Sequence, residues 1–410
     1  MAWRCTLHLR NHLNALITHF HLQPRFTFHN KMPGKHVDQA LEQPCRRCKD
    51  VSAVLVVRSE PLCRECFFKY VHTKAIKRLE SFRVRNANPN HQRTLLLPLS
   101  FGVSSVSLLH ILDRQLKTQM SKTGRTGFAI HVVHIQIPGD ESIITVDELL
   151  SKAKEAYPDF KYTSLALHDV FRLTSDATLN DLCPKTNHSE TASPPEKLAA
   201  LINSLTSATA RADVLSTLST RLTVEHAKTS GCEGILWGDT TTKLAEKTLS
   251  ETAKGRGFSL PWQISDGESP HGVTFNYPMR DVLKKELVSY VDLVGSPVSD
   301  LICEPSAIRQ ASMSSKNTTI DDLMSKYFEE VETNFPSIVS NVVRTTGKLE
   351  AVSAPASAPR CDLCSMPVSD GRFGIHGWGG DQQESAERIA IASGPQLCYG
   401  CSRSIPQPSK

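Results

Sequence analysis

The chain has 410 residues, of which 40% are hydrophobic and 22% are charged, and its formal net charge is +5. This length allows two or three domains, and the composition is that of an ordinary soluble protein. No apolar run reaches the roughly 18 residues that a membrane span needs, so we expect no membrane association through a spanning helix. A net charge this small predicts binding to a polyanion only where the basic residues cluster.

The first 40 residues have an unusual composition. Residues 1–37 contain six His and five Lys or Arg but no Asp or Glu. An amphipathic targeting segment has such a composition, but so can a disordered leader, in which case Met32 could be the true start of the protein. We therefore assign residues 1–40 to a leader outside the folded domains.

The spacing of the cysteines is a strong local signal. Eight of the twelve cysteines form four Cys-x-x-Cys pairs. Two such pairs supply the four thiolates of a tetrahedral zinc site, whereas a redox dithiol would need only one pair. We therefore predict a reducing compartment and two structural zinc sites, one formed by Cys45, Cys48, Cys63 and Cys66 and the other by Cys361, Cys364, Cys398 and Cys401. The remaining cysteines are expected to be buried structural thiols: Cys5, Cys183, Cys232 and Cys303.

A basic segment follows the first zinc site. Between residues 64 and 93, eight Lys or Arg side chains face only two acids, and aromatic residues are interleaved with them. Their helical spacing fits a solvated helix face, and it also fits a surface that contacts nucleic-acid phosphates. We assign residues 41–92 to an N-terminal zinc knuckle and basic helix. Its candidate contacts are Arg64, Lys69, Lys74, Lys77, Arg78, Arg83 and Arg85.

The stretch from Thr94 to Leu112 has the pattern of a strand, a tight loop and a helix. Four leucines of the strand precede the loop 100–105 (SFGVSS), and apolar residues then recur at helical spacing. The free N–H groups of such a loop, aided by the helix dipole, can hold a phosphate. Many α/β proteins have a similar turn for structural reasons alone, so the local pattern by itself is a weak indication of nucleotide binding.

Residues 93–346 alternate strands with helices. We expect further strands at 128–135, 162–167, 232–237 and 273–275, and helices at 147–156, 195–205, 211–224, 277–287, 319–331 and 338–343. This alternation predicts a parallel sheet with crossover helices, and hence an α/β fold. Residues 172–194 are polar and form an inserted loop, residues 347–360 are an Ala, Ser and Pro-rich linker, and residues 361–410 form the C-terminal zinc knuckle and tail.

Taken together, residues 40–405 resemble the PP-loop ATP-pyrophosphatase family that thiolates tRNA. The resemblance implies a parallel-sheet PP-loop ATP-pyrophosphatase-like core flanked by the two zinc knuckles. Catalytic members carry Ser-Gly-Gly-x-Asp-Ser at the loop, whereas this chain has Phe101 for the first glycine and Ser104 for the acid. Those members also have an acidic pair where this chain has Thr242 and Lys243, and cysteines near residues 205–211, where this chain has none.

Other segments match a non-catalytic branch of the family: Gly238-Asp239 followed by Leu244-Ala245, then Lys254-Gly255-Arg256-Gly257, then Pro278-Met279-Arg280-Asp281. The resemblance therefore implies the non-catalytic member of a heterodimer with a catalytic PP-loop thiolase subunit. That complex adds sulfur to the wobble uridine of tRNAs for Lys, Glu and Gln. The sulfur comes from a thiocarboxylated ubiquitin-related modifier, and the setting is the cytoplasm.

We accordingly predict no catalytic residue in this chain, two structural Zn²⁺ ions, and a degenerate nucleotide loop, while ATP binding is left open. The loop residues are Ser100, Gly102, Ser104, Ser105, Gly238 and Asp239, and further candidate tRNA contacts are Lys254, Arg256 and Arg280. One alternative is a self-sufficient ATP-dependent tRNA sulfurtransferase, which would need the missing acid and cysteines. Another is a zinc-knuckle RNA-binding module, which would not need the sheet core.

Overall fold

The computed structural model describes residues 43–88, 90–138, 143–174, 178–183, 192–303, 318–351, 358–368, 373–374 and 395–405. The predicted leader and the middle of the predicted linker, residues 352–357, lie outside the described residues. No helix in the described part is both long enough and apolar enough to cross a membrane.

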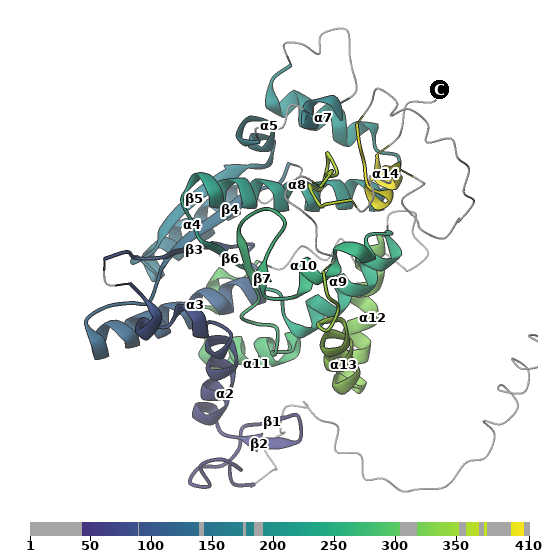
Figure 1. Ribbon diagram of the computed structural model, residues 1–410. Coiled ribbons are helices and arrows are strands. Elements are labelled where there is room, and N and C mark those ends of the chain that lie inside the picture. The colour runs from purple at the N-terminus through teal and green to yellow at the C-terminus, as the bar shows by residue number, and fades with distance from the viewer. Residues whose placement is uncertain are drawn as a thin grey trace, which may run out of the picture.

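A six-stranded sheet forms the centre of the molecule (Figure 1). The strand order is β5-β4-β3-β6-β8-β7, and every neighbouring pair is parallel except β7 with β8. The strands are β3 Thr94–Pro98, β4 Ala129–Gln136, β5 Lys161–Ala166, β6 Gly234–Leu236, β7 Gly267–Glu268 and β8 Thr274–Asn276. The predicted α/β class with a parallel sheet is confirmed. The carboxyl ends of the parallel strands meet at one edge, where open α/β sheets bind their ligands.

Two long helices flank the central strands. Helix α3, Val103–Thr123, begins within the segment predicted as the SFGVSS loop and ends at Gly124, whose left-handed φ of 69° is favourable for glycine. Helix α8 spans Ala208–Thr229. The other helices of the core are α4 Ile143–Ala156, α5 Val170–Leu173, α6 Thr178–Asp181, α7 Pro194–Ser204, α9 Thr241–Ala253, α10 Leu260–Ile264, α11 Lys284–Val294, α12 Ile320–Asn334 and α13 Pro336–Thr346. Helices α9, α12 and α13 pack side by side (Figure 1).

The two cysteine-rich units lie at opposite ends of the molecule (Figure 1). The N-terminal unit consists of the hairpin β1 Leu55–Val57 and β2 Glu60–Leu62, followed by α2 Arg64–Lys77. Its two-residue turn places Arg58 and Ser59 at φ values of 46° and 77°, as the twist of a tight hairpin requires. The C-terminal unit contains the short helix α14, Tyr399–Ser404.

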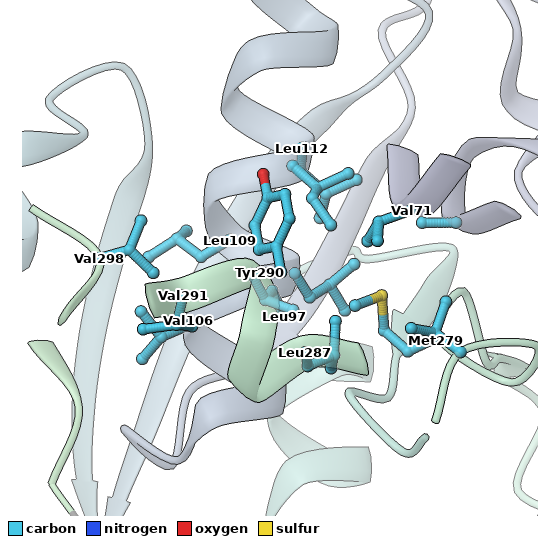
Figure 2. Close-up of a cluster of buried hydrophobic side chains, with 14 of the residues drawn as sticks. Val71, Leu97, Val106, Leu109, Leu112, Met279, Leu287, Tyr290, Val291 and Val298 are labelled. Atoms are coloured by element: carbon cyan, nitrogen blue, oxygen red, sulfur yellow. The ribbon is translucent and has the colours of Figure 1, made fainter. Parts of the chain in front are cut away.

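One buried cluster joins the N-terminal unit to the sheet (Figure 2). It contains Leu97 of β3, Leu109 of α3, Tyr290 of α11 and Val71 of α2, and all four are 0% exposed. Full burial of a large apolar side chain contributes roughly 1.5–3 kcal/mol, so this cluster holds α2 firmly on the core. The boundary that we predicted at residue 92 therefore does not separate two hydrophobic interiors.

Local predictions differ from the structure in three places. The helix expected at 277–287 begins only at Lys284, because the preceding segment is held in turns and the Tyr277 N–H donates to Asp266 Oδ1 at 2.6 Å. The basic helix ends at Lys77, and Arg85 lies in a separate 3-10 turn, Val84–Asn86. The segment predicted as an inserted loop includes helix α6.

Candidate functional site

The structure brings together the four cysteines of each predicted zinc site. In the N-terminal unit the ligand atoms of Cys45, Cys48, Cys63 and Cys66 all lie within 4.8 Å of one another, and so do those of Cys361, Cys364, Cys398 and Cys401 in the C-terminal unit. The described residues contain no disulfide among these thiols. Four converging thiols are the donor set of a closed structural zinc site, with no position left for a substrate. Both clusters therefore fit a tetrahedral metal ion.

The N-terminal unit is fixed to the core by two acidic residues whose docking role was not predicted from the sequence. Glu286, at the start of α11, accepts from Arg58 Nε and from the Tyr70 hydroxyl, each at 2.9 Å. Asp281 accepts from Arg78 Nε at 2.8 Å, and its carbonyl accepts from Lys74 Nζ at 2.7 Å. Two of the predicted tRNA contacts thus hold α2 against the core.

The remaining basic residues near α2 have different surroundings. Arg64 donates to the Leu293 carbonyl at 2.8 Å, and Arg83 and Arg85 form exposed ion pairs with Glu80. Lys69 and Lys77 are exposed and form no ion pair or side-chain hydrogen bond within the described part of the chain. These two lysines lie eight positions apart on one face of α2, which leaves that face available for a phosphate backbone.

The C-terminal unit is fixed by a buried network of ion pairs. Asp213 of α8 is 1% exposed at its side chain, and it pairs with Arg256 and with Lys254 Nζ at 3.1 Å. Glu251 of α9 accepts from Arg256 Nε at 2.6 Å and from Lys254 Nζ at 2.9 Å. The Ser404 hydroxyl of α14 donates to Asp213 at 2.7 Å, so the network reaches into the C-terminal unit.

The pKa of Glu251 and the space around two glycines both indicate that this network holds the C-terminal unit on the core. Burial would raise the pKa of Glu251, but the Arg256 and Lys254 cations lower it to about 2. A side chain at Gly400 would place its Cβ 2.5 Å from Arg256 Cγ, and one at Gly255, where φ is +82°, would lie 2.4 Å from the Tyr399 ring. The Gly-rich segment is therefore a docking surface for the C-terminal unit.

This finding corrects two predicted tRNA contacts. Lys254 and Arg256 are 8% and 3% exposed, with their charges neutralised by neighbouring carboxylates, so their side chains are not part of an RNA-facing surface. Arg280 is also buried, at 9% exposure, but it borders a cavity. The residue types alone could not distinguish these cases, because Asp213, which is buried with Arg256, lies 43 positions away in the sequence.

The loop 100–105 is closed on its own hydrogen bonds. The Ser105 hydroxyl donates to the Gly102 carbonyl at 3.1 Å and accepts from the Ser100 N–H at 3.3 Å. Phe101 takes a left-handed φ of 57°, which is unfavourable for a residue with a bulky side chain, and it is 1% exposed. Its ring packs against the His134 ring, with 5.2 Å between the two ring centroids.

The other predicted loop residues lie close by. A Cβ at Gly238 would be 3.2 Å from Ser105 Cα, so glycine here permits the β6–α9 connection to approach the start of α3. The Asp239 Oδ2 atom lies 3.8 Å from Lys247 Nζ. Ser104 is half-buried. Gly238 thus lies beside the start of α3, and the sharing of one site by all six predicted loop residues stays a prediction.

A cavity of about 330 Å³ lies beside the loop at the carboxyl edge of the sheet. It is bordered by Ser100, His134, Ser219 and Trp237. The Trp237 indole N–H and the Ser219 hydroxyl are buried without a hydrogen-bond partner in the described part of the protein. Thr242 and Lys243, which stand where the family resemblance led us to expect an acidic pair, do not border this cavity and have partners of their own. Thr242 donates to Glu332 at 2.8 Å, and Lys243 pairs with Glu246 at 3.0 Å.

We predict that the purified protein carries two metal ions per chain, because each cysteine cluster offers a complete ligand set. Cys45→Ser and Cys361→Ser should each remove one equivalent, measured by elemental mass spectrometry. The control Cys183→Ser, outside both clusters, should retain two. An unchanged metal content in either knuckle variant would show that its cluster is not a metal site.

We predict that Arg256→Ala lowers the free energy of unfolding by about 3–5 kcal/mol, because it leaves two carboxylates buried without their main partner. Chemical denaturation followed by circular dichroism measures this. The exposed control Lys122→Ala should change it by less than about 0.5 kcal/mol. Wild-type stability combined with weakened tRNA binding would instead return Arg256 to the RNA surface.

Known proteins resemble this chain over most of its length. A family model described as Cytoplasmic tRNA 2-thiolation protein 2 matches residues 319–403. The curated protein of that name from Phaeosphaeria nodorum is 64% identical over 92% of this chain and 98% of its own length. The one from Pyrenophora tritici-repentis is 61% identical over 92% and 98%.

Among solved structures, the U34-tRNA thiolase NcsA from Methanococcus maripaludis has a similar fold. It has a TM-score of 0.54 and 15% sequence identity, and the match covers 80% of this chain and 94% of that one. Identity at this level supports the fold alone. From the curated relatives, and in agreement with the PP-loop thiolase-like core, we conclude that the chain belongs to the cytoplasmic tRNA 2-thiolation protein 2 family.

Proposed function

We propose that this chain is the non-catalytic subunit of a complex that 2-thiolates the wobble uridine of tRNAs for Lys, Glu and Gln. The observation that carries the proposal is the loop 100–105, in which the Ser105 hydroxyl bonds to the loop's own backbone and Ser104 stands in the place of an acid. Phosphoryl and adenylyl transfer depend on positioned donors and metal ions that neutralise developing charge. A loop without a carboxylate lacks one means of holding such an ion.

The catalytic work would then belong to a second PP-loop thiolase subunit, with which this chain forms a heterodimer. In this proposal the sulfur is supplied by a thiocarboxylated ubiquitin-related modifier and passes through the partner. Among the described residues, the single cysteines do not join either four-cysteine cluster, so they offer no second thiolate set for sulfur chemistry. The names of the curated relatives, which specify the cytoplasm and tRNA 2-thiolation, support this assignment.

Zinc is the metal that we propose for both cysteine clusters. Thiolate-only tetrahedral sets are typical of structural zinc, and metal binding stabilises small segments that could not fold alone. At the N-terminal end the metal would fix the hairpin from which Arg58 reaches Glu286, and at the other end it would fix α14 against α8. The ions would thus shape the surface of the subunit without taking part in the reaction.

The exposed face of α2 is the part of the structure that we propose to contact the tRNA backbone. Lys69 and Lys77 lie on the side of the helix opposite to the buried Phe68 and Val71, and no described acid pairs with either lysine. Phosphate contacts made there would position the RNA without recognising its bases.

A reconstitution experiment tests the proposed division of labour. The isolated chain should release no AMP from ATP in the presence of tRNA, and thiolated tRNA should form only when the catalytic subunit, ATP and the sulfur donor are added. Release of AMP and the appearance of 2-thiouridine, measured by mass spectrometry, are the readouts. Thiolation by the chain without its partner would favour the self-sufficient sulfurtransferase instead.

We predict that Lys69→Ala combined with Lys77→Ala weakens tRNA binding by the complex. The slope of log K against log salt should fall by about 0.9 for each phosphate that the variant no longer neutralises. The change should be similar for different tRNAs. The matched control is Lys122→Ala with Arg125→Ala, which removes the same charge from the far end of α3. Equal binding by both double variants would exclude this face of α2.

A further inference from the structure

A second cavity lies between the N-terminal unit, the segment after β8 and helix α13. Its volume is about 450 Å³. Its charged lining consists of four arginines, Arg58, Arg78, Arg280 and Arg344, and two acids, Asp266 and Asp281. Four cations against two anions is a marked local excess in a chain whose net charge is only +5.

The two carboxylates of the cavity are already engaged. Arg78 pairs with Asp281 at 2.8 Å and with Asp266 at 3.4 Å. Arg58 pairs with Glu286, which is not part of the lining. The ion pairs made by the acids of the cavity therefore both involve Arg78, and the part of the lining away from Arg78 keeps an excess of positive charge.

Arg280 and Arg344 line this positive part of the cavity. The Arg280 guanidinium donates to neutral oxygens: the Ile264 carbonyl, the Val343 carbonyl at 3.2 Å and the Ser265 hydroxyl at 3.4 Å. Arg344 is exposed and forms no ion pair within the described residues. Burial and repulsion from Arg78 lower the pKa of Arg280 more than attraction to Asp266 and Asp281 raises it, so an added anion would stabilise its charged form.

The absence of a side chain at Gly347 leaves the space that the Arg280 guanidinium occupies beside the cavity. A Cβ at residue 347 would lie 2.0 Å from Arg280 Nη2 and 3.0 Å from the Val343 carbonyl oxygen. The backbone φ of Gly347 is −67°, which any residue can adopt, so the missing side chain matters for space and not for conformation. The end of α13 is thus shaped to seat the guanidinium beside the cavity.

We propose that this arginine-lined cavity binds a phosphate group. Guanidinium groups match phosphate with paired N–H donors, and several of them converging from different elements make a specific anion site. Under the proposed function, on which this source depends, the phosphate belongs to the backbone of the bound tRNA. The terminal phosphate of a free nucleotide has the same chemistry and is the other possible source.

The test is protection of arginine from phenylglyoxal in the full-length, metal-loaded wild-type chain, followed by mass spectrometry of the peptides. Arg344 is the reporter, and the exposed Arg125 at the other edge of the sheet is the control in the same molecule. Inorganic phosphate, AMP and unmodified tRNA are added separately, with chloride at matched ionic strength. At about 90% occupancy the modification of Arg344 should slow by about tenfold, because only the unoccupied fraction reacts, while that of Arg125 should not change.

The outcomes separate the possible sources. Protection by tRNA at concentrations at which AMP is ineffective assigns the site to an RNA phosphodiester, and protection by AMP at equally low concentration assigns it to a nucleotide. Protection by phosphate in a protein that does not bind tRNA supports the site while contradicting the proposed function. Equal modification of Arg344 with and without all three probes overturns the site. As a second variant, Gly347→Ala should displace Arg280 and reduce the protection severalfold.

Discussion

The buried ion pairs of Asp213 and Glu251 with Lys254 and Arg256 are the constraint on which much of the structure depends. Burying charges is unfavourable unless each has a partner, and removing one member leaves the others uncompensated. The network spans α8, α9 and the Gly-rich turn after α9, and Ser404 ties it to the C-terminal cysteine unit. The unit therefore packs on a surface that exists only when these helices are correctly placed.

The N-terminal unit is docked by a related arrangement at the other end of the molecule. Glu286 and Asp281 lie at the start of α11 and just before it, and they receive groups from the hairpin and from α2. The shared hydrophobic cluster supplies the bulk of the attachment, and these polar contacts fix its orientation. In both units the core segment that receives the four-cysteine knuckle holds it in place through ion pairs or hydrogen bonds. A cluster of basic residues can therefore serve to dock another part of the chain and need not contact RNA.

Much of the fold followed from local patterns. The strand, loop and helix at residues 94–123 were predictable from apolar periodicity, and the two cysteine sets were predictable from their spacing. The turns before Lys284 were not, because the bond between Tyr277 and Asp266 that holds them joins residues of different elements. The burial of Arg256 was also not predictable, since its partner Asp213 is 43 positions away. The pairing of Arg78 with Asp281 was not predictable for the same reason, because the two residues lie 203 positions apart.

Each four-cysteine knuckle and the core element that receives it should therefore form one cooperative unit. Hydrogen exchange with mass spectrometry, before and after chelation of the metal, measures this most directly. Loss of the metal should raise exchange in the knuckles and also in the receiving segments, residues 208–229 and 254–260 for the C-terminal unit and residues 281–294 for the N-terminal unit. Increased exchange confined to the cysteine segments, with α8 and α11 fully protected, would contradict it.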